Sequence, residues 1–308
     1  MSTETTNADG NETVSPSSSV NLESVRAIAK KDFKDSFRSW LFWGLSIFFF
    51  MLLVLFTGVL WYFDGDVIAA EGLTTALLIE EVGSITRLVI PLIALVLGWK
   101  AIAGERESGS IKILLSLPHS RKDVLLGKLI GRSAVLSLSL TVGFALAAIV
   151  VAAMVGSFDI GDYLGLLVMS IIYGIAYTSI AIAASSLTRS TTIAGAAIFG
   201  VFVLFYIVWD SVLVAVYLLI AFEYLPDSET IAQLALFYRS LDPGTAYWSV
   251  LSLFTSFGGL DDQTVMMLET MFDDVPFYLE DWFAMIVFLF WIIVPTLVAM
   301  FRLDRVDL

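Results

Sequence analysis

The chain has 308 residues, of which 58% are hydrophobic and only 15% are charged, whereas a soluble domain is usually about half apolar and about a quarter charged. It has no cysteine and one histidine, His119, so disulfides, thiolate-bound metals and paired-histidine metal sites are excluded for a single chain. The net charge of −13 argues against nucleic acid as a partner, because nucleic acid binds basic surfaces. We therefore expect a protein of the lipid bilayer.

The first residues differ in composition from the rest of the chain. Residues 1–20 are rich in Ser, Thr and Asn and contain almost no large apolar side chains. Such a segment cannot bury enough apolar surface to offset the entropy lost on ordering. We predict a disordered tail over residues 1–20 and a single membrane domain over residues 21–308.

A helix is predicted from Asn21, a plausible N-cap, to Trp40. Its apolar residues recur on one broad face, and most of its lysines lie opposite. A basic amphipathic helix before a spanning segment is typical of a helix at the cytoplasmic membrane surface. Arg26 and Asp32 fall within the apolar face, which leaves a solvated basic helix as the alternative.

Six apolar runs follow, each close to the roughly 20 residues that a spanning helix needs. They cover residues 40–63, 82–99, 133–156, 162–187, 192–209 (or as far as 222) and 282–301. The predicted fold is an all-α integral membrane protein with six transmembrane helices and an N-terminal interfacial helix.

The basic residues predict the orientation of these spans. Fifteen of the 17 Lys and Arg residues lie in the N-terminal segment, the second and fourth connections and the C-terminus. The alternate connections, residues 64–81, 157–161 and 223–281, hold only Arg239. Because basic residues concentrate in cytoplasmic loops, we expect both termini on the cytoplasmic side of the cell membrane.

Acidic residues show the opposite bias. Eleven Asp and Glu residues lie between Glu223 and Asp281, and more lie in residues 64–81. Dense carboxylates with few lysines suit a protein that stays hydrated in strong salt, which predicts a halophilic archaeal source. The alternative is an outer vestibule that attracts cations.

Two charges lie inside the predicted spans, where a charge costs about 3 kcal/mol on insertion scales. Arg87 is near the outer end of its span, where it can extend toward Glu80 or Glu81 or serve transport. Asp210 has two interpretations. The fifth span ends near it and residues 211–222 form a re-entrant helix, or the span continues and Asp210 faces a cavity that holds cargo.

The second connection, Glu105–Lys128, is the most informative segment. Its first half has a short apolar face that includes Ile111 and ends before Pro118, because the residue before proline avoids the α region. Ser120 and Asp123 have the spacing of a capping box at the start of a second helix. A helix, a turn and a second helix between two spans can transmit a push from a cytosolic partner.

This loop resembles that of the type-2 exporter class of ATP-binding-cassette (ABC) transporter permeases, and more narrowly the branch that includes the permease for maturing nitrous oxide reductase. The matching positions are Glu105, Glu107, Gly109, Ser110, Leu114, Leu115, Pro118, Arg121, Gly127 and Lys128. The resemblance implies that the loop carries a coupling helix for a cytosolic ATPase subunit. It also implies a second permease subunit in a homo- or heterodimer, export as the direction of transport, and a re-entrant segment after the fifth span.

ATP hydrolysis is not expected in this chain, because the sequence has no GxxxxGK followed by Ser or Thr. ATP and Mg²⁺ would bind the partner ATPase, so we expect a transport subunit with no catalytic residue and no cofactor. Three alternatives stay open: an ordinary basic connection without a coupling role, a channel or secondary transporter, and an intramembrane enzyme. Small residues at helical spacing, such as Gly127 with Gly131 and Ala196 with Gly200, permit close packing within the subunit or between permease subunits.

Overall fold

The computed structural model describes residues 20–38, 40–63, 75–111, 120–155, 159–256, 258–260, 262–272 and 275–305. The predicted tail therefore lies, apart from Val20, outside the described residues. The longer helices are α1 (Leu22–Phe37), α2 (Trp40–Phe63), α4 (Thr75–Gly98), α7 (Arg121–Val155), α8 (Ile160–Ser186), α9 (Thr191–Val203), α10 (Trp209–Ala221) and α14 (Asp281–Arg305). The shorter elements are α5 (Ala103–Glu107), the π-helix η1 (Leu204–Val208), α11 (Glu229–Ser240), α12 (Pro243–Leu251), α13 (Asp262–Phe272) and the 3₁₀-helix η2 (Phe277–Leu279).

Six helical stretches of the described chain are long and apolar enough to cross a membrane, which confirms the predicted all-α integral membrane fold. α2 has the predicted bounds, but α4 begins at Thr75 instead of residue 82 and α7 at Arg121 instead of residue 133. The prediction stopped these helices at charged residues. Glu, Lys and Arg are good helix formers, so the backbone continues through them.

The fifth span is one continuous helical stretch from Thr191 to Ala221. α9 passes through the five-residue π segment η1 directly into α10. The helix therefore reaches as far as the longer of the two predicted extents, and it does not end near Asp210. The side chain of Asp210 is exposed on α10, so it does not face a cavity within the described chain.

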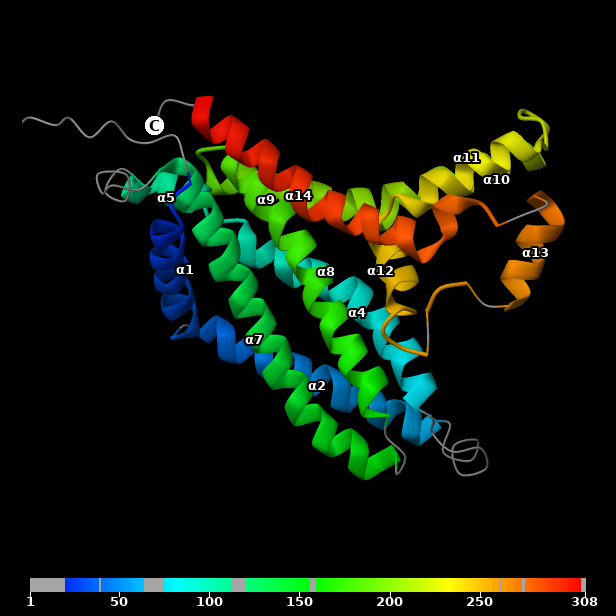
Figure 1. The fold of residues 1–308 in the computed structure, drawn as a ribbon, viewed down its shortest axis with the longest axis horizontal. Coiled ribbons are helices and arrows are strands. Elements are labelled where there is room, and N and C mark those ends of the chain that lie inside the picture. The colour runs from blue at the N-terminus through cyan, green and yellow to red at the C-terminus, as the bar shows by residue number, and fades with distance from the viewer. Residues whose placement is uncertain are drawn as a thin grey trace, which may run out of the picture.

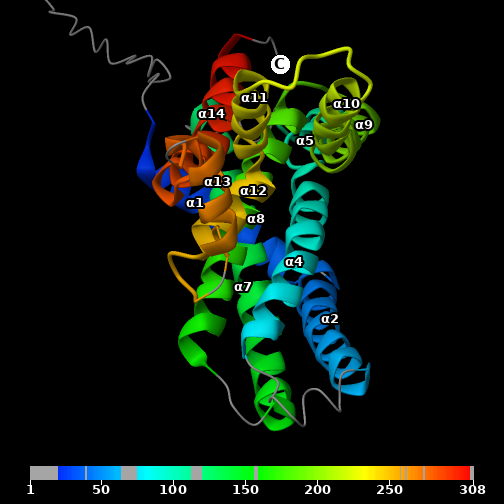
Figure 2. The same cartoon turned by 90° about the vertical axis from the view of Figure 1, so that its right-hand side faces the viewer.

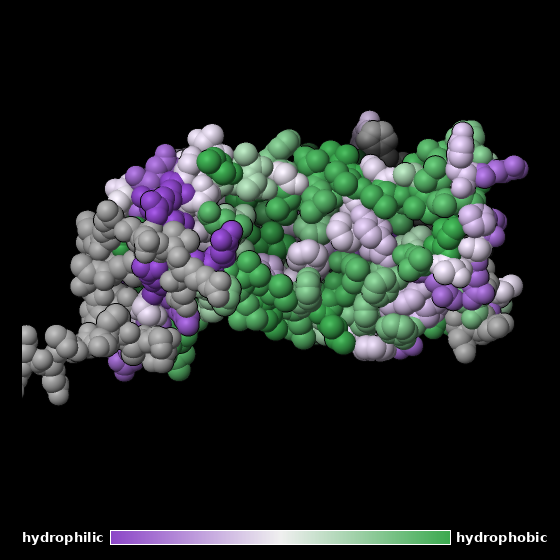
Figure 3. All heavy atoms as spheres, turned by 90° about the horizontal axis from the view of Figure 1, so that it is seen from above, coloured by the Kyte–Doolittle hydropathy of each residue, from purple (hydrophilic) through white to green (hydrophobic). Residues whose placement is uncertain are grey.

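α8 is at the centre of the bundle, packed against α4, α7 and α14 (Figures 1 and 2). The core is built around its large side chains, among them Tyr173 and Tyr177, which are fully buried. α9 lies beside α4, α5 and α8, and the α9–α10 stretch has 6% of its hydrophobic window buried, against 78% for α8. Figure 3 shows apolar residues in a broad band between two polar ends, as a bilayer requires.

The two ends of the bundle differ in architecture. One end, which we call the α1 end, holds α1, α5, the start of α7 and the end of α14 (Figure 1). The other, the α13 end, holds α11, α12, α13 and the start of α14. The connection between residues 223 and 281 contains α11, α12, α13 and η2.

Ser185 of α8 stabilises the turn between the end of α4 and the start of α5. Its hydroxyl accepts hydrogen bonds from the backbone N–H groups of Ile102 (3.1 Å) and Ala103 (3.0 Å) and donates one to the carbonyl of Trp99 (2.7 Å). These are backbone groups that the end of one helix and the start of the next leave without partners. The side chain of Ser185 is fully buried, so no solvent replaces it.

We expect Ser185→Ala to lower the free energy of unfolding by about 2–3 kcal/mol, because it leaves two buried N–H donors unpaired. The matched control is Ser186→Ala, since among the described residues the buried Ser186 hydroxyl bonds only to the carbonyl of Ala183 in its own helix. Unfolding in detergent micelles, followed by circular dichroism, compares the two variants. An equal loss in the free energy of unfolding for the two variants would show that the Ser185 hydrogen bonds do not stabilise this turn.

Candidate functional site

The short helix α5 is attached to the α8–α9 connection by Arg106. One guanidinium nitrogen of Arg106 donates to the carbonyls of Ser186 (2.8 Å) and Thr188 (3.2 Å). These carbonyls are at the end of α8, where no intrahelical donor reaches them. Arg106 therefore fixes α5 against the turn that leads into the fifth span.

A second set of contacts, which we call the α5 cluster, consists of Asp32, Glu105, Lys128 and Arg132. The Lys128 ammonium lies 2.5 Å from a carboxylate oxygen of Glu105 and 3.2 Å from one of Asp32. Arg132 Nε is 3.1 Å from the other Asp32 oxygen, as an ion pair without hydrogen-bond alignment. The side chains of Lys128 and Asp32 are only 8% and 7% exposed, so the cluster joins α1, α5 and α7 in a buried position.

Close helix packing brings Asp32 to this place. α1 packs along α7, where Gly127 and Gly131 face it. A β-carbon on Gly127 would lie 2.7 Å from Ile28, and one on Gly131 would lie 2.9 Å from the Cβ of Asp32. Only glycine permits this approach, so this glycine pair serves packing within the subunit. Asp32 on the apolar face of α1 is thus explained by cations on α7.

Asp123 joins the starts of α1 and α7. One of its oxygens accepts from the backbone N–H of Asn21 (2.8 Å) and the other from that of Ser120 (2.8 Å), whose hydroxyl in turn accepts from the Asp123 N–H (3.1 Å). The predicted capping box is therefore present, and the predicted N-cap Asn21 accepts from Glu23 N–H. The Asp123 carboxylate therefore binds the backbone at the start of both α1 and α7.

Glu107 connects α5 to the fifth span. Its carboxylate accepts the backbone N–H of Thr191 at 2.7 Å, at the N-terminus of α9, where a negative charge is favourable. Gly109 follows with φ of 74°, a conformation that suits glycine, and the Ser110 hydroxyl lies 3.0 Å from that of Ser108. α5 is thus bound to α7 through Glu105, to α8 through Arg106 and to α9 through Glu107.

The other predicted loop residues are only partly placed. Leu114, Leu115 and Pro118 lie outside the described residues, so the coupling helix itself stays a prediction. Arg121 begins α7, and its guanidinium donates to the carbonyl of Leu303 at 2.8 Å, which connects α7 to the end of α14.

Sequence reasoning missed four residues of this site: Asp32, Arg106, Arg132 and Ser185. Asp32 carried a signal, because a carboxylate within an apolar stripe requires a buried cation. Arg106 and Arg132 were counted only as basic residues of a connection. Ser185 carried no signal, since a serine in a span commonly bonds to its own helix.

The α13 end contains a second polar site, around Arg87. Its guanidinium lies 2.9 Å from a carboxylate oxygen of Asp242, the N-cap of α12. The predicted pairing with Glu80 or Glu81 stays a prediction, because their side chains lie outside the described residues. The Asp242 side chain, 5% exposed, also accepts from the backbone N–H of Thr245 at 2.7 Å.

The backbone of Arg87 is also fixed by hydrogen bonds. Its carbonyl accepts hydrogen bonds from the hydroxyls of Tyr173 in α8 (3.0 Å) and Tyr206 in η1. The two hydroxyls are 3.1 Å apart. Because the π segment η1 changes the register of the fifth span at this level, it aims Tyr206 at the carbonyl of Arg87.

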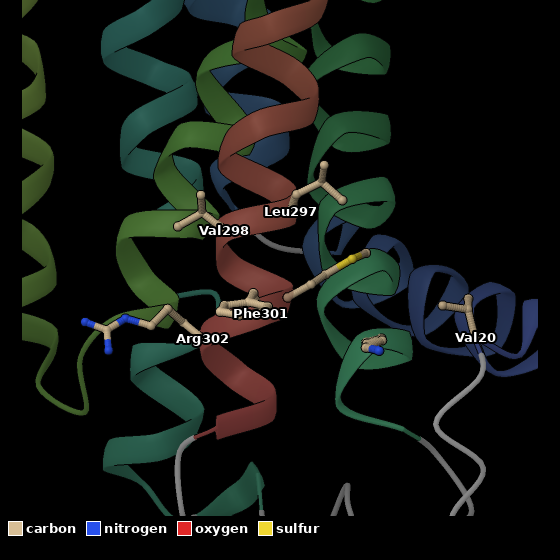
Figure 4. A pocket seen from close by; sticks show the side chains of 7 residues that line it. Val20, Leu297, Val298, Phe301 and Arg302 are labelled. Atoms are coloured by element: carbon tan, nitrogen blue, oxygen red, sulfur yellow. The ribbon is translucent and has the colours of Figure 1, made fainter.

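An apolar depression of about 790 Å³ lies at the α1 end between α14 and the start of α7. It is lined by Leu297 and Phe301, with Lys122 and Arg302 at its border (Figure 4). Figure 4 shows Arg302 pointing away from Val20, on the other side of α14. Most of the lining is apolar, so this surface is suited to contact with lipid and not to a specific ligand.

These features define a class: a multi-pass helical membrane protein in which one short helix is bound by charged side chains to three spanning helices. The chain belongs to the ABC-2 family of transporters, since the family model described as "ABC-2 family transporter protein" matches residues 26–308. It is thus a membrane permease subunit of an ABC transporter.

Curated relatives support this membership. The probable ABC transporter permease protein NosY of Stutzerimonas stutzeri is 30% identical over 212 residues, which cover 67% of this chain and 75% of the relative. The protein of the same description from Pseudomonas aeruginosa is 30% identical over 201 residues, which cover 63% of this chain and 71% of the relative. The predicted resemblance to this branch of permeases is confirmed.

Proposed function

We propose that this permease works with a separate cytosolic ATPase subunit and exports its cargo, with α5 and residues 112–119 as the element that receives the motion of the ATPase. The observation that carries the proposal is the attachment of α5 to α7, α8 and α9 by Glu105, Arg106 and Glu107. A displacement of α5 would act on three spans at once. Such a displacement is a two-state change biased by nucleotide binding to the partner.

The proposed orientation places the α1 end in the cytoplasm. All described Lys and Arg residues except Arg87 and Arg239 belong to residues 22–38, to residues 100–132, to the α8–α9 connection or to the end of α14. Basic residues gather on the cytoplasmic side of membrane proteins. In this orientation α1 lies at the inner membrane surface, α5 faces the ATP-containing compartment, and α11, α12 and α13 are outside.

The proposed assembly contains two permease subunits and two ATPase subunits. The fifth span supports this, because α9 and α10 contact the rest of the chain on a narrow face and leave Phe199, Ile207 and Tyr217 exposed. A β-carbon on Gly200 of this helix would meet no other part of the described chain within 4 Å. A second permease packed here would make the close helix contacts that small residues permit.

Co-purification tests the coupling assignment. The full chain is co-expressed with a candidate ATPase, chosen as a Walker A-containing protein whose gene neighbours that of the permease, and binding is compared for two variants that each replace six residues with a Gly-Ser sequence. One variant changes residues 112–117, and the matched control changes residues 66–71, in the first outer connection. We expect the first to reduce ATPase binding at least tenfold and the control to leave it unchanged.

Retention of the ATPase by the first variant would contradict the coupling assignment. Failure of the unmodified chain to bind any such ATPase would contradict the whole proposal and favour a channel or secondary transporter. Arg121→Glu is a less specific test, because Arg121 also bonds to the carbonyl of Leu303.

A further inference from the structure

A cavity of about 300 Å³ lies at the α13 end, between α4, α11, α12 and α13. Two arginines line it, Arg87 from α4 and Arg239 from α11, and none of its described lining residues is acidic. This volume is at the lower limit of small-molecule sites, which measure about 300–1,000 Å³. The cavity therefore has the size for one small ligand.

The charge of the cavity is opposite to that of its surroundings. Arg239 is the only basic residue between residues 223 and 281, where eleven acids lie. Within the described part of the chain, the guanidinium of Arg239 makes no ion pair, and the one carboxylate beside Arg87 is that of Asp242. Asp242 neutralises one of the two arginines, so an excess positive charge remains, as an anion site requires.

The position of Arg87 is built by the start of α12. A β-carbon on Gly244 would lie 2.5 Å from the Arg87 Nε, so the glycine leaves room for the guanidinium against this helix. One guanidinium nitrogen of Arg87 donates a hydrogen bond to the Asp242 carboxylate, and 36% of the Arg87 side chain stays exposed. An arginine has five N–H donors, so donors remain for a ligand.

The wall of the cavity combines hydroxyl groups with apolar side chains. Thr245 and Ser249 of α12 line it beside Trp248 and Leu260. The chain returns over α12 through Gly258 and Gly259, at φ of 91° and 72°, and the Gly259 N–H donates to the carbonyl of Trp248 at 3.1 Å. This return closes one side of the cavity.

We propose that this cavity binds a small organic anion, in which a phosphate, sulfonate or carboxylate group pairs with Arg87 and Arg239 and an apolar part contacts Trp248 and Leu260. As an assignment of cargo, the inference rests on the proposed transport function. As an assignment of a binding site, it stands on the cavity alone. The same chemistry is found in a phospholipid headgroup, so the experiment distinguishes a free anion from a lipid.

The test measures binding of phenyl phosphate to the full chain in phosphatidylcholine nanodiscs by isothermal titration calorimetry, with empty nanodiscs as the blank. Inorganic phosphate lacks the apolar part, and benzyltrimethylammonium has the opposite charge. We expect phenyl phosphate to bind more tightly than either. Equal binding of phenyl phosphate and the cation would overturn the proposal, and equal binding of inorganic phosphate would overturn the role of the apolar wall.

Arg239→Gln is the decisive variant, because the side chain is exposed and its removal should not affect folding. We expect it to weaken phenyl phosphate binding at least tenfold, through loss of a charge-assisted hydrogen bond. Arg302→Gln, an exposed arginine of the α1 end, is the matched control and should bind as the unmodified chain does. Unchanged binding by Arg239→Gln would overturn the proposal.

The lipid arm repeats the titration in nanodiscs that contain phosphatidylglycerol. A weaker apparent affinity there assigns the cavity to the headgroup of an anionic lipid, whereas an unchanged affinity assigns it to a free anion; both outcomes support an anion site. Failure of this inference leaves ATPase co-purification unaffected. Failure of co-purification leaves the binding site intact, so the two proposals are tested separately.

Discussion

Replacing Lys128 with methionine is expected to lower the free energy of unfolding by about 3–5 kcal/mol, the range for breaking a buried ion pair. Lys128 lies within 4 Å of both Asp32 and Glu105. Without it, the buried Asp32 keeps only the poorly aligned contact to Arg132. Methionine has nearly the same length and keeps the apolar stem contacts, so the loss reports on the charge. The free energy of unfolding is measured by detergent titration, with unfolding followed by circular dichroism.

The matched control is Lys31→Met on α1, because that lysine is exposed and exposed charges contribute at most about 1 kcal/mol. A second comparison separates the pair from the lysine itself. If the ion pair is the cause, Lys128→Met with Asp32→Asn is less destabilising than the sum of the two single changes. Additive losses would show that Lys128 acts through packing instead of charge.

The parts of the fold that could be predicted from the sequence depend on residues that are close to one another in the chain. α2 contains 24 residues without a charge, so the apolar run fixed both of its ends. Asn21 and the pair Ser120–Asp123 were recognised as caps because capping depends on residues three positions apart. In each of these cases the interacting residues are neighbours in the chain.

The polar contacts of the two sites could not be predicted in this way. Lys128 and Asp32 are 96 positions apart, and Arg87 and Asp242 are 155 apart. Charge and burial showed that Arg87 needed a partner, and the nearest acids in the sequence, Glu80 and Glu81, were chosen. The partner that the described side chains show is Asp242, the N-cap of α12, in a connection whose helices have no long apolar period.

The continuous fifth span has a related physical reason. One interpretation placed an interruption at Asp210, because a charge is costly within a bilayer. One acid within a helix does not break its backbone hydrogen bonds, and the helix changes register through the π segment Leu204–Val208. Tyr206, within this segment, contacts Arg87 and Tyr173, which lie more than 30 positions away in the sequence.

Asp242→Ala is expected to be as destabilising as the change at Lys128, by about 3–5 kcal/mol. It removes the partner of Arg87 and, at the same time, the N-cap that accepts from Thr245 at 2.7 Å. The control is Asp227→Ala, an exposed acid of the same connection, which should change the free energy of unfolding by less than about 0.5 kcal/mol.

The ion pair and the cap can be separated, because asparagine is as good an N-cap as aspartate. Asp242→Asn keeps the cap but leaves Arg87 unpaired, and Arg87→Met with Asp242→Asn keeps the cap and removes both charges. We expect the double variant to recover most of the stability that Asp242→Asn loses, since neither side chain then carries a charge that needs a partner. If the double variant is no more stable than Asp242→Asn, the cost at this position does not come from the unpaired arginine.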